Sequence, residues 1–389
     1  MDSKWGRVIG RVVLSCGALY TAYTVIQRRY ETEAKVYDGM QELIGNTPMV
    51  KLKSLCDKDR NINVYAKLEM NNPGGSAKDR IALNIIQVAE AEGRLVRGEP
   101  GMVFEGTSGS TGISLAMICN ALGYKAHISL PDDTSLEKLN LLKSLGAIIN
   151  PVKPASIVDP DQYVNAAKKA CDDYLESGKT KYAIFSDQFE NEHNWEIHYR
   201  TTGPEIYKQL KGKVNCFISG CGTGGTISGV SKYLKERIRP YVVLADPQGS
   251  GFYNRINYGV MYDSVEKEGT RRRHQVDTIV EGIGLNRLTF NFLKGEKYID
   301  ESIRVTDPQA IKMAKFLSIN EGLFIGSSTA INAVAALELI RRNDQAILPN
   351  DSNIVIIACD SGSRHLSKFW KEALQVPDTV TLNEILASK

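Results

Sequence analysis

The feature that most constrains the fold of this 389-residue chain is an alternation of short β-branched runs with longer amphipathic segments. Short runs rich in Val and Ile suit buried strands, whereas the segments between them repeat their apolar residues at helical spacing. Strands that alternate with helices build parallel sheets, so the sequence predicts the α/β class. The predicted strands are 63–70, 101–106, 125–131, 147–152, 215–220, 241–246 and 353–359, and the predicted helices are 79–92, 111–122, 135–145, 161–176, 226–237, 307–321 and 329–342.

The first 30 residues differ in composition from the rest of the chain. Their only acid is Asp2, and residues 4–11 carry three cations at helical spacing, as mitochondrial targeting peptides do. Residues 8–26 contain a single charge and are long enough for a borderline membrane span. We predict a membrane anchor or targeting segment at residues 1–34 and a mitochondrial location at the outer membrane. Cleavage of this segment with release into the matrix, and a buried core helix, are the alternatives.

Charge and cysteine usage argue against several classes of protein. The net charge is +3, and the one dense basic run, at residues 271–274, has acids beside it, so nucleic-acid binding has little electrostatic support. The seven cysteines form no CxxC pair and have no clustered histidines around them, so no metal site is predicted. Reduced thiols fit an intracellular protein better than a secreted one.

Three predicted strand-to-helix turns are rich in glycine, at residues 105–116, 219–230 and 359–367. Each turn would bring backbone N–H groups to one edge of the sheet, where anions bind in open α/β folds. A tight turn needs glycine for backbone reasons as well, so no single turn decides its own role. The second turn also matches G-x-G-x-x-G and is followed by Asp246, which keeps an NAD-dependent dehydrogenase open as an alternative.

Lys78 stands at the junction between a Pro-Gly-Gly turn and the helix predicted to follow it. A cation in a first helical turn lies at the unfavourable end of the helix dipole, so its position calls for an anionic or electrophilic partner. A cofactor with an aldehyde and a phosphate would satisfy both Lys78 and the turn at residues 222–226, because the aldehyde can condense with the amine. Pyridoxal phosphate is the cofactor that this combination predicts.

A series of motifs occurs in the order found in the cysteine synthase and cystathionine β-synthase family, which the chain resembles from about residue 40 to about residue 370. The insertion-bearing region 249–287 is similar to a fungal, mitochondrial cysteine-synthase-like branch of that family. The motifs are IGNTPMVKL (44–52), NNPGGSAKDRIAL (71–83), EGTSGSTGISLA (105–116), DQFENEHNWEIHYRTTGPEI (187–206), GCGTGGTISGV (220–230), EGIG (281–284), IGSSTA (325–330) and DSGSRHLS (360–367).

The resemblance implies a fold type II enzyme with two open-sheet α/β domains and pyridoxal phosphate in the cleft between them. The expected domains are residues 38–186, which carry the cofactor lysine, and residues 187–375, which carry the phosphate loop. Lys78 would bind the cofactor covalently and then act as the general base at Cα. Ser361 would contact the pyridine nitrogen, and the adjacent Asp360 is the alternative for this role. The phosphate loop would be Gly222, Thr223, Gly224, Gly225 and Thr226, and the residues for the substrate carboxylate would be Thr107, Ser108, Gly109, Thr111 and Gln188.

The activity that the resemblance implies is β-replacement of the cysteine synthase type, in which O-acetylserine and sulfide give cysteine and acetate. Ser110 departs from the family pattern, since an asparagine usually contacts the 3′ oxygen of the cofactor there, and a serine reaches it only weakly or through water. Cysteine desulfhydration, which releases sulfide, pyruvate and ammonia, therefore stays open, as does an inactive binding scaffold. The resemblance also implies a homodimer.

Overall fold

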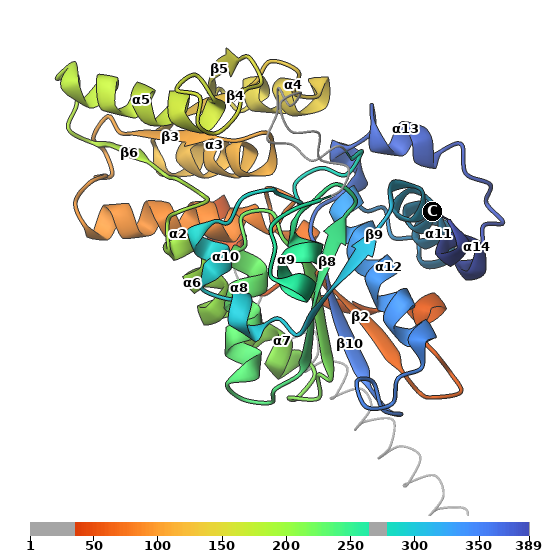
Figure 1. The fold of residues 1–389 in the computed structure, drawn as a ribbon. Helices are drawn as coiled ribbons and strands as arrows, with labels where there is room; N and C mark the ends of the chain where they lie inside the picture. Colours follow the sequence, from red (N-terminus) through yellow and green to blue (C-terminus); the bar gives the residue numbers. More distant parts are fainter. Residues whose placement is uncertain (1–35, 264–277, 389) are drawn as a thin grey trace, which may run out of the picture. The chain divides into compact units, whose positions relative to one another are not determined.

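The fold is built on two sheets, in a computed structural model that describes residues 36–263 and 278–388 (Figure 1). Both sheets lie in the compact unit formed by residues 43–389. The larger has the strand order β1-β2-β10-β7-β8-β9 and the smaller has the order β5-β4-β3-β6. Every neighbouring pair is parallel except β1 and β2, which are antiparallel. The predicted α/β class is confirmed.

The described strands and helices follow the predicted alternation closely. The strands are β1 (Met49–Lys51), β2 (Asn63–Leu68), β3 (Met102–Gly106), β4 (Lys125–Pro131), β5 (Ile148–Val152), β6 (Ala183–Phe185), β7 (Cys216–Gly220), β8 (Tyr241–Pro247), β9 (Glu301–Val305) and β10 (Asn353–Ala358). The helices are α2 (Lys78–Ala91), α3 (Ser110–Leu122), α4 (Leu136–Ser144), α5 (Tyr163–Glu176), α6 (His193–Ile197), α7 (Gly203–Gln209), α8 (Gly225–Lys235), α9 (Phe252–Tyr258), α10 (Phe290–Leu293), α11 (Asp307–Glu321), α12 (Ser327–Arg342), α13 (Phe369–Ala373) and α14 (Leu382–Ala387).

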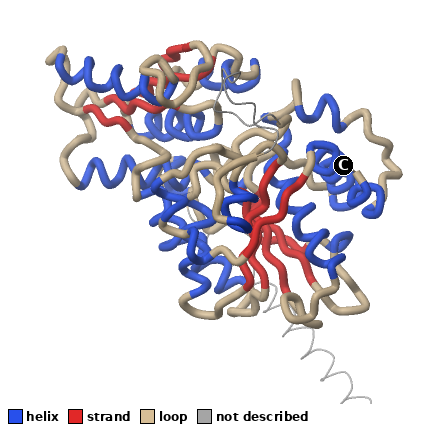
Figure 2. The backbone as a smooth tube through the Cα atoms, viewed as in Figure 1, coloured by secondary structure: helices blue, strands red, loops and turns tan. Residues whose placement is uncertain are grey.

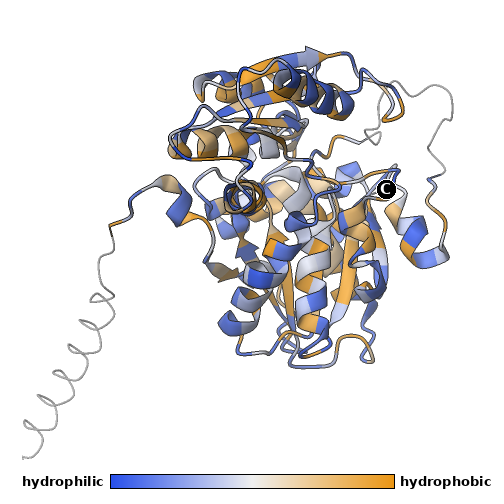
Figure 3. Ribbon diagram, turned by 90° about the vertical axis from the view of Figure 1, so that its left-hand side faces the viewer, coloured by the Kyte–Doolittle hydropathy of each residue, from blue (hydrophilic) through white to orange (hydrophobic). Residues whose placement is uncertain are grey.

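Helices cover both faces of the six-stranded sheet (Figure 2). Successive residues of β10 point to opposite faces, as the strand period of two requires, so Ile354 and Ile356 pack with α11 and α12 while Val355 and Ile357 pack with α7 and α8. A strand buried on both faces has to be apolar throughout, which explains the unbroken run at residues 354–358. The apolar colouring of this sheet is visible in Figure 3.

The smaller sheet has its own core, in which α2 and α3 pack together. Sheet membership does not simply follow the chain, because β1 and β2 pair within the six-stranded sheet, next to β10. The division into domains at residues 38–186 and 187–375 stays a prediction. The expected anchor at residues 1–34 lies outside the described residues, and within 36–263 and 278–388 no helix has the length and apolar character of a membrane span.

Candidate functional site

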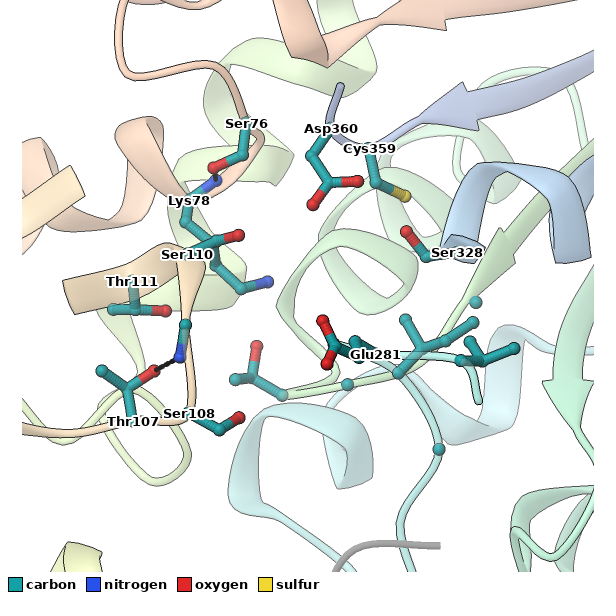
Figure 4. Close-up of a pocket in the computed structure, with 18 of the residues that line it drawn as sticks. Ser76, Lys78, Thr107, Ser108, Ser110, Thr111, Glu281, Ser328, Cys359 and Asp360 are labelled. Carbon is teal, nitrogen blue, oxygen red and sulfur yellow. Dashed lines mark hydrogen bonds between the residues drawn. The ribbon is translucent and has the colours of Figure 1, made fainter. Parts of the chain in front are cut away.

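A cavity of about 460 Å³ lies where the carboxyl ends of strands from both sheets meet (Figure 4). This volume is in the range of small-molecule sites. All three glycine-rich turns contribute to its lining, although they are far apart in the sequence. The predicted site residues that line it are Lys78, Thr107, Ser108, Gly109, Ser110, Thr111, Gln188, Gly222, Thr223, Gly224, Gly225 and Thr226.

Lys78 is the first residue of α2, and its side chain extends into the cavity (Figure 4). The hydroxyl of Ser76 accepts the Lys78 N–H at 3.3 Å, as expected for a residue just ahead of a helix. In the first turn of α2, the Asp79 carboxylate accepts the Gly74 N–H at 2.6 Å and the Ser114 hydroxyl. Desolvation lowers the pKa of the Lys78 amine and so favours the neutral form, which is the form that condenses with an aldehyde.

The first turn connects β3 to α3 and places Thr107–Thr111 on one wall of the cavity. Its backbone is organised locally, since the Thr107 hydroxyl accepts the Gly109 N–H at 3.2 Å. The Thr111 hydroxyl donates to the side-chain oxygen of Gln188 at 2.5 Å, which brings Gln188 over the same turn. A hydroxyl-rich turn at a helix N-terminus can bind a carboxylate, because its donors and the helix dipole both favour an anion.

The second turn connects β7 to α8, and glycine is required there for steric reasons. Gly224 has φ +92°, a conformation that L side chains rarely adopt, and a Cβ at this position would lie 2.5 Å from the Phe292 nitrogen. A Cβ at Gly222 would overlap the Gly282 carbonyl oxygen, and one at Gly225 would overlap Asn194 Oδ1. The turn therefore presents bare backbone to the cavity at the start of α8.

Known proteins resemble this chain over most of its length. A sequence model of pyridoxal-phosphate dependent enzymes matches residues 40–360. The "Putative mitochondrial cysteine synthase" of Saccharomyces cerevisiae is 68% identical over 97% of this chain and 95% of its own length. Cysteine synthase 2 of Neurospora crassa is 51% identical over 86% of this chain and 73% of its own. The crystal structure of an O-ureido-L-serine synthase superposes with a TM-score of 0.72 at 27% identity, covering 91% of this chain and all of that one.

The chain belongs to the family of pyridoxal-phosphate dependent enzymes. Its cofactor is pyridoxal phosphate, as predicted, and the cavity fits that group. The cavity is lined by the Lys78 amine, by the glycine turn at residues 222–226, where added side chains would clash, and by the hydroxyl-rich turn at residues 107–111. The roles of the individual residues stay predictions.

The alternative of an NAD-dependent dehydrogenase is wrong for this pyridoxal-phosphate dependent enzyme. The glycines of the G-x-G-x-x-G match form the turn at residues 222–226. Asp246 has a structural partner instead of a ligand. The Asp246 carboxylate is fully buried and accepts the Tyr253 N–H at 2.7 Å, at the start of α9. Burial raises the pKa of this carboxyl to about 7, so it is poorly suited to hold a ribose as an anion.

Two predicted positions in this enzyme have partners that the sequence did not indicate. The Ser110 hydroxyl accepts a hydrogen bond from the Arg364 guanidinium at 3.0 Å. Ser361 is half-buried at the end of β10, where its hydroxyl accepts the Ser363 N–H at 3.3 Å and the Ser363 hydroxyl at 3.0 Å. Ser361 is not among the residues that line the cavity, whereas Asp360 is.

A charged cluster that includes His365 lies on the cavity wall and carries no signal in the sequence. Glu281 accepts from Lys138 at 2.5 Å and lies 3.2 Å from His365, whose other ring nitrogen is 2.9 Å from Asp360. Burial disfavours the imidazolium, but Asp360 and Glu281 raise the pKa of His365 to about 9. Burial likewise disfavours the Glu281 carboxylate, yet His365 and Lys138 lower its pKa to about 2. His365 and Glu281 are therefore both charged at neutral pH.

Proposed function

We propose that this enzyme is a cysteine synthase that replaces the acetoxy group of O-acetylserine with sulfide, giving cysteine and acetate. The observation that carries the proposal is the position of Lys78 in one cavity with two separate anion-binding turns. One turn suits the phosphate of the cofactor and the other suits the α-carboxylate of an amino acid. The names of the similar yeast and Neurospora proteins support the same activity.

Each part of the site then has a chemical task. Thr107–Thr111 and Gln188 bind the carboxylate and fix the amino acid, while Gly222–Thr226 bind the cofactor phosphate. Bound pyridoxal phosphate supplies the electron sink that makes the Cα proton acidic. The neutral amine of Lys78 removes that proton, and acetate leaves Cβ with the electron pair of the C–O bond. Hydrosulfide then forms the C–S bond at Cβ, and the Lys78 ammonium returns a proton to Cα.

We propose Ser361 as the partner of the pyridine nitrogen, as the sequence motif implies. This role requires its hydroxyl to turn from Ser363 toward the cavity, while Asp360 already lines the cavity and is held by His365. The visible absorption spectrum of the bound cofactor distinguishes the two. Ser361→Ala should shift the spectrum, and an unchanged spectrum in Ser361→Ala beside a shifted one in Asp360→Asn would assign the role to Asp360.

The direct test is to give the purified enzyme O-acetylserine with sulfide and, separately, cysteine alone. We expect cysteine and acetate from the first mixture and little sulfide or pyruvate from the second. Faster release of sulfide, pyruvate and ammonia from cysteine would make the enzyme a desulfhydrase instead. Absence of turnover with both, in protein that carries its cofactor, would favour a binding scaffold. Lys78→Ala is the matched inactive control.

We further propose that the enzyme is mitochondrial and held at the outer membrane by residues 1–34. The cationic, acid-poor composition of this segment and the name of the yeast relative support the location, and the apolar run at residues 8–26 supports the anchor. Cell fractionation followed by alkaline extraction tests both. A shortened protein in the soluble matrix fraction would favour a cleaved targeting segment. Light scattering of the purified enzyme tests the proposed homodimer.

A further inference from the structure

Asn194 on α6 connects the two sides of the cavity through one side-chain amide. Its Nδ2 donates to the backbone carbonyl of Gln188 at 2.6 Å and to the Thr223 hydroxyl at 2.9 Å. Asn194 itself is fully buried. A single amide thus joins the segment that closes over the carboxylate turn to the turn proposed to bind phosphate.

The chemistry of the partners fixes which end of the amide faces them. A carbonyl oxygen can only accept, so the atom 2.6 Å from the Gln188 oxygen must be the NH₂ group. Its second hydrogen then occupies a lone pair of the Thr223 hydroxyl. Because a hydroxyl has one hydrogen of its own, Thr223 is left as a donor toward the cavity that it lines.

The other end of the same amide lies against Gly225. A Cβ at Gly225 would overlap Asn194 Oδ1, so only glycine leaves room for the amide. Within the part of the chain that the structure describes, this oxygen has no hydrogen-bond partner. Burying an acceptor without a partner is unfavourable, so an amide at this place is explained by its two donor bonds rather than by packing.

His198 holds the other threonine of the turn, one helical turn further along. Its Nε2 lies 3.1 Å from the Thr226 hydroxyl and its Nδ1 lies 2.9 Å from the Thr202 hydroxyl. Burial lowers the pKa of His198 to about 3, so the ring is neutral and one nitrogen donates while the other accepts. With the hydrogen on Nε2, Thr226 is also left to donate into the cavity.

We propose that Asn194 is a positioning residue that couples cofactor phosphate binding to recognition of the substrate carboxylate, and that His198 assists it by orienting Thr226. A phosphate that accepts a hydrogen bond from Thr223 fixes the orientation of the Thr223 hydroxyl, and this hydroxyl fixes the orientation of the Asn194 amide. The amide fixes the backbone of Gln188, whose side chain accepts from Thr111 in the carboxylate turn. This inference rests on the proposed function for its substrate side and on the family cofactor for its phosphate side.

Asn194→Asp is the sharpest variant, because it keeps the size of the side chain and removes the donors. A carboxylate oxygen would face the Gln188 carbonyl, and Thr223 would donate to the carboxylate instead of the phosphate. We expect the ³¹P resonance of the bound phosphate to shift and the Kd for pyridoxal phosphate to rise about tenfold or more. The concentration of O-acetylserine that half-saturates the visible spectral change should also rise about tenfold.

Two comparisons separate positioning from folding. His193→Gln, on the same helix, should stay within about twofold of the wild type in every measurement, because the His193 side chain pairs with Glu196 on the half-exposed face of the helix. His198→Gln retains an N–H near the Nε2 position and should keep the wild-type ³¹P resonance, whereas His198→Ala should shift it. Unfolding midpoints of the cofactor-free proteins report any loss of stability, and the His198 pair decides the question if Asn194→Asp does not fold.

An unshifted ³¹P resonance with an unchanged cofactor Kd in Asn194→Asp would overturn the inference. A change in cofactor binding alone, with wild-type affinity for O-acetylserine, would overturn the coupling. If the wild-type holoenzyme itself gives no spectral change with O-acetylserine, the proposed function fails. The cofactor measurements would then still decide whether Asn194 positions the phosphate turn.

Discussion

The two anion-binding turns start from the same plan and differ in how tightly they are built. Each joins the end of a parallel strand to the start of a helix, β3 to α3 and β7 to α8. In the turn at residues 222–226, added Cβ atoms would meet the Gly282 backbone, the Phe292 backbone or the Asn194 amide. In the turn at residues 107–111, the nearest neighbours of a Cβ on Gly109 would be atoms at the end of the Lys138 side chain, at 3.3 Å.

This difference matches the two ligands that we propose. A cofactor that stays bound gains from a turn whose donors are fixed in advance, because no ordering is needed when the phosphate enters. A substrate that enters and leaves in every cycle is served by a turn whose neighbours can move. Gly109, with φ 176°, lies outside the left-handed region that Gly224 occupies.

The largest effect is expected at Lys78, which lines the same cavity as both turns. Lys78→Ala removes the covalent link and the base together, so we expect kcat/KM to fall by about 10³-fold or more, with loss of the visible absorption of a lysine-bound cofactor. Steady-state kinetics and absorption spectra measure this. Lys368→Ala removes a half-exposed cation at the same cavity and is the control. If Lys78→Ala retained turnover, the reaction would not take place at Lys78 between the two turns.

A pair of glycine substitutions, one in each turn, tests whether the two turns differ in rigidity. Gly224→Ala forces a side chain into a left-handed conformation and against the Phe292 backbone, at a cost of about 1–3 kcal/mol, so the cofactor Kd should rise roughly ten- to hundredfold. Gly109→Ala should change stability and cofactor binding by about 0.5 kcal/mol or less. Cofactor titration followed by fluorescence measures both. Equal effects of the two substitutions would show that the turns do not differ in rigidity.

The buried carboxyl of Glu105, beside Gln188, should make substrate binding at the carboxylate turn depend on pH. Glu105, at the end of β3, is fully buried behind Gln188 and accepts from the Ser186 hydroxyl and, at 3.3 Å, from the Gln188 N–H. Burial raises the pKa of its carboxyl to about 8, so it is protonated at neutral pH and becomes an anion as the pH rises through 8.

Because that new anion would lie behind the group that holds a substrate carboxylate, the KM for O-acetylserine should rise about three- to tenfold between pH 7 and 9. Glu105→Gln, which cannot ionise, should show a flat KM across this interval. Ser186→Ala keeps the carboxyl but removes a donor that lowers its pKa, so the rise should move to higher pH. This carboxyl is linked to the phosphate turn indirectly, through Gln188 and Asn194, so cofactor affinity should follow the same curve with a smaller amplitude. A KM that rises equally in Glu105→Gln would assign the effect to another group.

Sequence reasoning succeeded where the signal is local. The strand 125–131 and the helix 307–321 have the predicted bounds, and that helix has a capping box at Thr306 that marks its start. The strands β1, β6 and β9 were missed because they are short, with three to five residues, and carry little periodicity. The glycine turns and Lys78 were found for the same reason, since a strand, a glycine run and a helix start are neighbours in the chain.

The remaining site residues carry no local signal because they act on distant partners. Asn194 reaches Thr223, Glu281 reaches Lys138, and both contacts exist only after the two sheets are assembled. Ser361 shows the opposite difficulty, since its motif is readable but the direction of its hydroxyl depends on packing at the end of β10. Local motifs thus identify the turns, and the tertiary structure determines how each turn is held.

A small effect is expected at the ion pair that joins the two sides of the cavity. Lys138, on α4, lies over the carboxylate turn, and its partner Glu281 belongs to the segment beside the phosphate turn. Lys138→Met leaves Glu281 still paired with His365, so we expect only a two- to fivefold rise in KM for O-acetylserine, which corresponds to about 0.5–1 kcal/mol. A double-mutant cycle with Glu281→Gln measures the coupling of the pair.

Since Lys138 touches the adaptable turn, its loss should raise KM while leaving the cofactor Kd unchanged. A larger change in the cofactor Kd than in KM would mean that the two turns respond as one rigid body, and that the contrast between a fixed and an adaptable turn is wrong.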